Sequence, residues 1–122
     1  MEKDYDILSR NLTEKEMWSS FAWIIDCLFR HRIETVAVMF GFGWGDYEYE
    51  TIQLSDLRPR VEKAEAQELG SLSTDDLYIK VEGVVQVQFC HHADIHLLYI
   101  QKEHPLTNEL KIYLTDIIGL HK

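Results

Sequence analysis

The densest group of chemically active residues in this sequence is the run from Cys90 to His96, which holds five potential metal ligands in seven residues. In a straight strand His92 and His96 lie about 13 Å apart, at about 3.3 Å per residue, which is too far to share one zinc ion. Neighbours such as His92 and Asp94, or a turn that folds the segment back, bring ligands closer together. We therefore expect a polar turn with no bound metal. A metal-dependent enzyme or metal-binding protein that uses His92, Asp94 and His96 stays an alternative.

Cys90 beside two histidines also raises the question of nucleophilic catalysis. Adjacent strand residues point to opposite faces, so Cys90 and His91 do not meet within a strand, and Cys90 lies about 6.6 Å from His92. The sequence contains no GxSxG or HExxH motif. We therefore expect no catalytic residue, no cofactor and no enzymatic activity.

A glycine-rich segment covers residues 41–45, with the sequence GFGWG. Phosphate-binding loops need the spacing GxGxxG or GxxxxGK[ST] and lead into a helix. This segment has neither spacing, and it leads into Asp46, Glu48 and Glu50. The glycines are therefore better explained by a bent hairpin than by phosphate binding.

The charge of the chain is strongly negative and unevenly distributed. Twelve Lys and Arg against twenty-one Asp and Glu give a net charge of −9. The average field repels nucleic acid and anionic lipid, so we expect neither as a partner. Residues 33–57 contain five acidic residues and no Lys or Arg. This concentration favours a basic protein as the partner.

Aromatic residues alternate with the acids in this stretch, a combination that tight protein interfaces use. The tyrosines taken alone have an equally valid interpretation, in which the strand is solvated and its tyrosines pack into the core. The acids also have a second option, pairing with Arg58, Arg60 or Lys63. The residues predicted to bind a partner are Trp44, Asp46, Tyr47, Glu48, Tyr49 and Glu50, followed by Asp75, Asp76, His92 and Asp94.

Length and composition indicate one globular domain over residues 1–122. The chain has 46% hydrophobic residues and two prolines, which argues against disorder. It has no apolar run of membrane-spanning length, and its first residues lack a signal-peptide core. Cys27 and Cys90 lack CxxC spacing, so we expect buried free thiols in the reducing environment of the cytoplasm.

The hydrophobic pattern predicts helices alternating with groups of strands. Thr13 and Glu16 form a capping box at the start of a helix that ends near Arg32, with Met17, Phe21, Ile24 and Leu28 as its buried stripe. Further helices are expected from Ser55 to Leu69 and after Thr107, each capped by that Ser or Thr. The buried stripe expected for the last helix is Leu110, Leu114, Ile117 and Ile118. Strands are expected at 35–40, 46–52, 77–81, 84–89 and 95–100.

Between residues 85 and 99 the odd positions are mainly apolar, and the even positions from 86 to 96 are polar. This parity predicts one buried and one solvated sheet face, and the solvated face could bind something. The order of elements, without regular βα alternation, predicts an α+β fold. We expect a mostly antiparallel five-stranded sheet with about three helices packed mainly on one face.

Three segments have the character of family signatures: 42–46 (FGWGD), 76–79 (DLYI) and 89–97 (FCHHADIHL). With the small size and acidic charge, the chain resembles immunity proteins of bacterial polymorphic toxin and contact-dependent growth inhibition systems. The resemblance implies stoichiometric binding to a basic, nuclease-type toxin domain, and a monomer or weak dimer. An oligomeric scaffold module is a further alternative.

Overall fold

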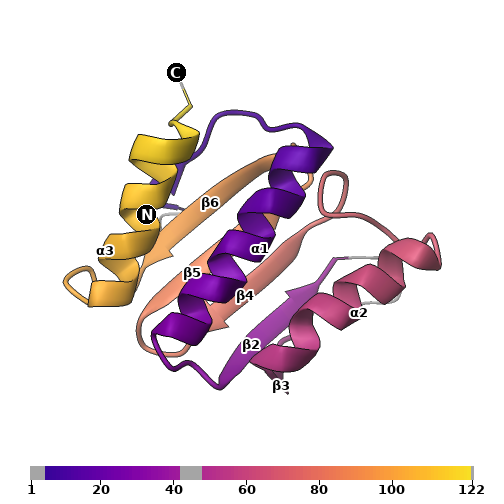
Figure 1. Cartoon of the computed structure of the whole chain (residues 1–122), viewed down its shortest axis with the longest axis horizontal. Helices are drawn as coiled ribbons and strands as arrows, with labels where there is room; N and C mark the ends of the chain where they lie inside the picture. Colours follow the sequence, from indigo (N-terminus) through magenta and orange to yellow (C-terminus); the bar gives the residue numbers. More distant parts are fainter. Residues whose placement is uncertain (1–4, 42–47, 122) are drawn as a thin grey trace.

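The computed structural model describes residues 5–41 and 48–121, which form a six-stranded antiparallel sheet with a layer of helices (Figure 1). The strands lie in the order β1-β6-β5-β4-β2-β3. Their bounds are β1 Ile7–Leu8, β2 Thr35–Phe40, β3 Glu50–Gln53, β4 Leu77–Val81, β5 Val85–Cys90 and β6 Asp94–Tyr99. The predicted α+β class is confirmed, but the sheet has one strand more than expected. A two-residue strand such as β1 is too short to produce an alternating pattern.

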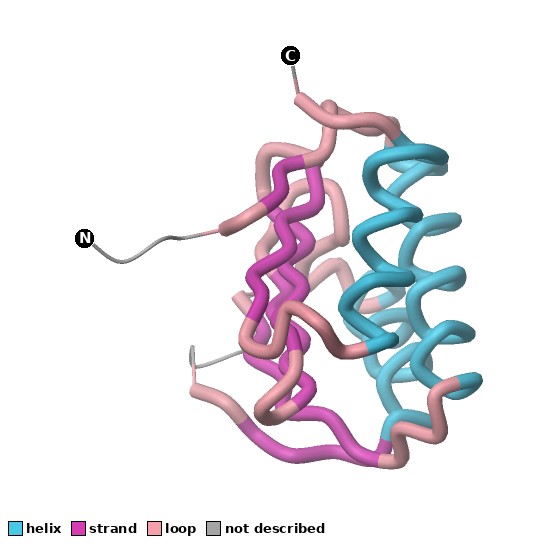
Figure 2. Tube along the Cα trace, turned by 90° about the vertical axis from the view of Figure 1, so that its left-hand side faces the viewer, coloured by secondary structure: helices cyan, strands magenta, loops and turns pink. Residues whose placement is uncertain are grey.

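The helices are α1 (Glu14–Arg30), α2 (Leu54–Ala66) and α3 (Pro105–Ile112), and a π-helical segment, η1 (Tyr113–Ile118), continues α3. They lie together on one side of the sheet (Figure 2). Among the described residues, no helix has both the length and the apolar character needed to cross a bilayer.

The capping box predicted for α1 is present. The Thr13 hydroxyl accepts the Glu16 N–H at 3.1 Å, and the Glu16 carboxylate accepts the Thr13 N–H at 2.9 Å. The predicted stripe of Met17, Phe21, Ile24 and Leu28 is fully buried. Phe21 packs edge-on against Phe89 of β5, with ring centroids 5.4 Å apart. This contact anchors α1 across the middle of the sheet.

The starts of the other two helices differ from the prediction. Ser55 is not a cap, because α2 already begins at Leu54 and Gln53 occupies the cap position without a side-chain hydrogen bond. Thr107 lies inside α3, buried, and its hydroxyl donates to the Val84 carbonyl at 3.4 Å. His104 is the cap instead, since Pro105 is well suited to the first turn of a helix.

The last helix also buries fewer residues than its spacing predicts. Leu110 and Leu114 are buried, but Ile117 is 64% exposed. In η1 the hydrogen bonds span five residues instead of four, which rotates the side chains after Tyr113 relative to an α-helix. A stripe extrapolated from α-helical spacing therefore fails at this end.

Strands β5 and β6 form a hairpin with a three-residue turn at 91–93, and the hairpin preserves the predicted parity. Phe89 pairs with Ile95 and Cys90 with Asp94, so odd residues face odd residues. Ala93 has a left-handed backbone (φ 60°), which closes the turn. The odd strand residues from Val85 to Leu97 are buried under the helices, as predicted, whereas Tyr99 at the end of β6 is half-buried. His91 is an exception, since it belongs to the turn and is exposed.

We predict that the α1 capping box makes stability depend on pH in the acidic range. Hydrogen bonds from Arg10 and the Thr13 backbone lower the pKa of Glu16 to about 2, from an ordinary value of 4.5. A lowered folded-state pKa stabilises the protein above about pH 4.5 and stops doing so as the pH falls towards about 2. The difference in unfolding midpoint between wild type and Glu16→Gln should therefore be largest near neutrality and shrink on acidification, as measured by urea denaturation at several pH values.

The matched control is Glu14→Gln, which changes a carboxylate in the same helical turn but leaves the capping box intact. The difference in unfolding midpoint between Glu14→Gln and wild type should not shrink comparably towards low pH. A pH-independent difference for Glu16→Gln would contradict the prediction.

Candidate functional site

The sheet face opposite the helices carries a continuous set of polar and aromatic side chains. Register places Tyr78 beside Gln88 and Gln88 beside His96, while Lys80 lies beside Gln86 and Gln86 beside Leu98. Because strand residues alternate between faces, these side chains share the face turned away from the helices. We call this the uncovered face (Figure 2). It holds a shallow groove of about 420 Å³ lined by Tyr5, Tyr78, Gln86, Gln88, Cys90, His91, His92, His96 and Leu98.

A hydrogen-bond network centred on Asp76 organises one end of this groove. The Asp76 carboxylate accepts the His91 N–H at 2.9 Å, contacts the His91 ring nitrogen Nδ1 at 3.0 Å and accepts the Gln88 amide at 3.3 Å. Gln88 also donates to the Tyr78 hydroxyl at 3.1 Å. Burial alone would raise the pKa of Asp76, but the hydrogen bonds from His91 and Gln88 outweigh it, so the pKa lies below its ordinary value.

Tyr49 extends over the uncovered face from the opposite edge of the sheet. Its hydroxyl donates to Gln86 of β5 at 3.2 Å, and Lys80 of β4 lies over its ring at 5.4 Å. Three strand spacings of about 4.8 Å separate β3 from β5, more than a tyrosine side chain reaches. The chain entering β3 therefore curves over the face, and Tyr49 is 41% exposed there instead of lying in the core.

The predicted acidic strip is divided by the sheet. Glu50 pairs in register with the buried Val38, so it points towards the helices, where it forms an ion pair with Arg60 of α2. The exposed Glu48 precedes the strand, because β3 begins at Glu50 and residues 48–49, which were predicted to be strand, are not part of it. Trp44, Asp46 and Tyr47 lie outside the described residues. The described acidic residues of the strip thus lie in two different environments.

The second group of predicted partner residues is also divided. Asp75 is used locally, since its carboxylate accepts the Ser71 N–H at 3.0 Å and the Thr74 hydroxyl at 2.9 Å. Asp76 and the exposed His92 lie at the groove. Asp94 is only 7% exposed, and its carboxylate contacts His96 Nε2 at 3.0 Å.

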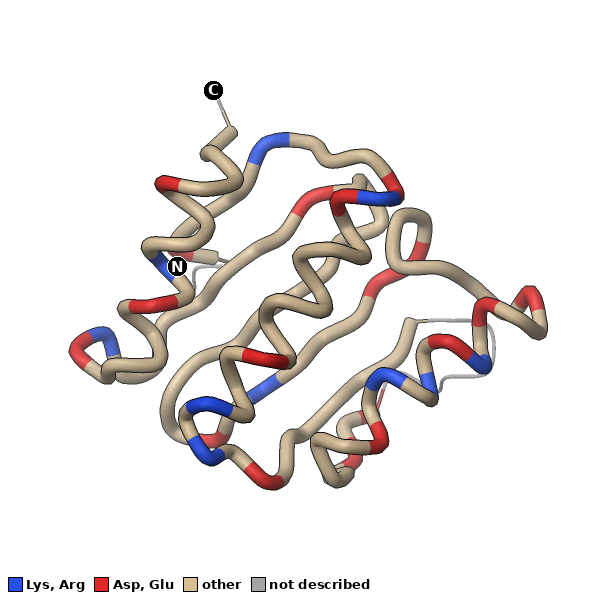
Figure 3. The backbone as a smooth tube through the Cα atoms, in the orientation of Figure 1, with Lys and Arg blue, Asp and Glu red and all other residues tan. Residues whose placement is uncertain are grey.

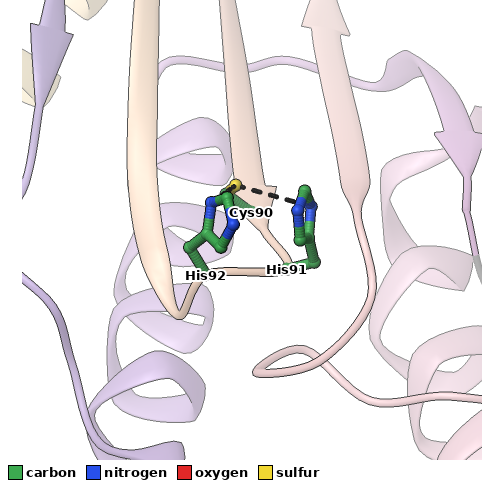
Figure 4. A group of neighbouring side chains, drawn as sticks. All are labelled: Cys90, His91 and His92. Carbon is green, nitrogen blue, oxygen red and sulfur yellow. Dashed lines mark hydrogen bonds between the residues drawn. The ribbon is translucent and has the colours of Figure 1, made fainter.

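Cys90 meets both neighbouring histidines, contrary to the expectation for a straight strand. Its sulfur lies 3.8 Å from Nδ1 of His91 and 3.8 Å from Nδ1 of His92, with the two rings on either side (Figure 4). The strand ends at Cys90, so the following residues turn back and do not alternate between faces. Burial raises the pKa of the Cys90 thiol, and the nearby Asp94 and Asp76 charges add to this effect.

Another group of possible ligands, Cys27, His31 and Glu109, joins α1 to α3. The Cys27 thiol donates to Glu109 at 2.9 Å, and Arg30 binds the same carboxylate at 2.8 Å. His31 contacts it at 3.3 Å. A guanidinium already neutralises this carboxylate, so we interpret the group as a helix-to-helix contact.

Sequence reasoning missed Tyr78, His91 and Tyr5 as members of the groove. The even-residue parity did identify Gln86, Gln88, Cys90 and His96 as one polar surface. Tyr78 follows the same parity on β4, which pairs with β5. His91 could not be found by parity, since it lies in the turn. Tyr5 could not be found because β1, which places it near His96, was not predicted.

No protein-family model, curated protein or solved structure matches this chain.

The structure predicts that Cys27 is chemically inert in the folded protein. Burial first, and then the Glu109 carboxylate, raise its pKa to about 12. At about pH 8 only about one such thiol in 10⁴ is ionised, and the thiolate is the reactive form. In a Cys90→Ser variant, the reaction of the remaining thiol with Ellman's reagent should be at least about 100-fold slower when folded than in urea. Equal rates in the two conditions would contradict this.

Proposed function

We propose that this protein acts by binding another protein, as an immunity protein that neutralises a basic toxin domain of the nuclease type. The observation that carries the proposal is the uncovered face. An antiparallel sheet tolerates one solvated face, so exposure alone is unremarkable in a small domain. This face, however, presents Tyr49 and Tyr78 beside a groove, and aromatic side chains next to a concave surface are common anchors in interfaces.

Negative charge at the rim supports a basic partner. Glu48 and Glu82 are exposed, and Asp76 lies at the groove. Glu82 is close enough to Tyr49 for its charge to add to the effect of burial in raising the pKa of the tyrosine. Figure 3 shows red segments on the helices and near strand ends and turns, and the acidic residues outnumber the basic ones, in line with the net charge of −9. Such a field speeds the encounter with a positively charged protein.

The expected mode of action is stoichiometric occlusion. A nuclease domain has a positively charged surface that contacts phosphates, and an acidic protein seated there competes with nucleic acid. The proposal places this chain in the cytoplasm as a monomer or weak dimer, where its partner would act. It needs no catalytic group in this chain.

The decisive experiment uses the reading frame next to the one that encodes this chain. The carboxyl-terminal domain of a large protein encoded immediately upstream should co-purify with this chain in equal amounts, and co-expression should restore growth that the domain alone arrests. Failure of that domain to bind would overturn the proposal. A scattering mass showing a tight dimer that buries the uncovered face would instead favour the scaffold alternative.

Reversing an acidic charge beside the uncovered face should slow association with this partner. Glu82→Lys removes attraction beside Tyr49 at the uncovered face, so we expect an association rate about three- to tenfold lower at low salt and a weaker salt dependence. Glu50 is unsuitable for this test because it pairs with Arg60. Asp116→Lys makes the same charge change on the helical layer. It should leave the rate within about twofold, as measured by biolayer interferometry.

Removing the aromatic anchor should act on dissociation instead. Tyr49→Ala is expected to raise the dissociation rate about tenfold, in line with a loss of about 1–2 kcal/mol at an interface anchor. Phe29→Ala provides the matched control, since Phe29 is a comparably exposed aromatic on α1, at 48% against 41% for Tyr49. Equal effects of the two substitutions would place the binding surface elsewhere.

A further inference from the structure

The turn between β5 and β6 brings together a thiol and two imidazoles with the spacing of metal ligands. Zn–S distances of about 2.3 Å and Zn–N distances of about 2.0–2.1 Å in a tetrahedral site place sulfur and nitrogen about 3.6 Å apart. The Cys90 sulfur lies 3.8 Å from Nδ1 of both His91 and His92. The three ligand atoms all lie within 4.8 Å of one another. The two sulfur-to-nitrogen distances therefore match those around an ion to within a few tenths of an ångström, and rotation of the imidazole side chains brings the two nitrogens to the separation that the ion needs.

The backbone holds these side chains in place. The Ala93 N–H donates to the Cys90 carbonyl at 2.9 Å, which closes the turn. The amino-terminal segment ties the turn down from outside, since Asn11 donates to the His92 carbonyl at 2.8 Å and the Leu12 N–H to the Ala93 carbonyl at 2.7 Å. A turn fixed from both sides loses little conformational entropy when its side chains bind a ligand.

A second, independent feature lies beside the same sulfur. Asp94 and His96 of β6 form another group of possible ligands with Cys90, again within 4.8 Å. His96 Nε2 contacts Asp94 at 3.0 Å, while its Nδ1 is buried and has no hydrogen-bond partner among the described residues. A buried polar atom without a partner is costly, and a ligand supplies one explanation. Metal-binding histidines also typically use their second nitrogen to contact a carboxylate.

We propose that this chain binds one zinc ion on the uncovered face, through the Cys90 thiolate and the Nδ1 atoms of His91 and His92. Asp94 and His96 lie beside the same sulfur, on the other strand of the hairpin. A thiolate with imidazoles selects zinc over magnesium or calcium, which prefer oxygen ligands. This departs from the expectation of a polar turn with no bound metal.

Binding requires the ligands to lose protons. The Cys90 thiol releases its proton to solvent, as does any ligating nitrogen that carries one. His91 Nδ1 gives up its contact with Asp76, but the Asp76 carboxylate still accepts the His91 backbone N–H. Asp76 therefore continues to orient the turn.

The Cys27, His31 and Glu109 group supplies an internal comparison. It offers a thiol, one imidazole and a carboxylate, but Arg30 already binds the Glu109 carboxylate at 2.8 Å and the Cys27 thiol donates to it. An incoming cation would have to displace a guanidinium there. We therefore expect Cys90, and not Cys27, to provide the thiolate.

The test is titration of the untagged, chelator-treated chain with Zn²⁺ by calorimetry and with Co²⁺ by absorption spectroscopy. We expect saturation at one ion per chain, and a sulfur-to-cobalt charge-transfer band with the strong visible bands of a tetrahedral site. Cys90→Ser should abolish the charge-transfer band and weaken zinc binding at least about 100-fold, and His91→Ala and His92→Ala about tenfold or more each. Cys27→Ser should leave affinity and spectrum unchanged.

Three results would overturn the proposal. The first is the absence of saturable binding at about 100 µM zinc, and the second is wild-type zinc affinity in Cys90→Ser. The third is that His96→Gln loses zinc binding while the His91→Ala/His92→Ala double variant keeps it. Circular dichroism of each metal-free variant separates loss of a ligand from loss of the fold. The readout is metal binding alone, so its outcome is independent of whether a toxin domain binds.

Discussion

The alternation of apolar and polar side chains along β4, β5 and β6 is the constraint on which the structure depends. Each strand has a single apolar side, so the sheet can bury only one face without exposing polar groups to a dry interior. All of the described helices therefore cover the same face, and α1 fills its centre through Phe21 against Phe89. The opposite face is left to solvent or to a partner as a direct result of this packing.

The same one-sided packing explains why many of the polar and metal-ligating side chains lie on the uncovered face. Polar residues excluded from the core lie on the uncovered face, and the hairpin register aligns them in rows across β4, β5 and β6. The β5–β6 turn then adds two residues that no strand pattern controls, His91 and His92. The contacts of Asn11 and Leu12 hold that turn, so a segment early in the chain positions side chains about eighty residues later.

The proposed partner surface and the proposed metal site occupy adjacent parts of this face for different physical reasons. Protein association relies on aromatic area and on long-range charge, which Tyr49 and the rim carboxylates provide. Metal binding relies on a few ligand atoms held at fixed separations, which the turn provides. His92 lies in both regions, exposed at the end of the groove. An ion there would stiffen the turn and reduce the negative field at that end of the face.

The sequence by itself determined the elements whose signals are local. The capping box at Thr13, the buried stripe of α1 and the parity of residues 85–99 follow from hydrogen bonds and alternation within a few residues, and the structure confirms them. The class of fold and the existence of one polar sheet face follow from these patterns. The predicted cap at Thr107 was wrong, because a rule based on local sequence does not account for tertiary contacts. The helix begins at Pro105, and the Thr107 hydroxyl donates to the Val84 carbonyl inside the protein.

Only the tertiary structure decided which residues meet. Strand β1 forms by pairing with the edge of β6, and no pattern within Ile7–Leu8 predicts it. Glu50 and Tyr49 are neighbours in sequence, yet Glu50, which pairs with β2, contacts Arg60, while Tyr49, which precedes the strand, contacts Gln86 of β5. Cys90 reaches two imidazoles because the chain reverses at the next residue. Sequence spacing measures distance along a strand, whereas contacts across a turn or a sheet depend on where the chain folds back.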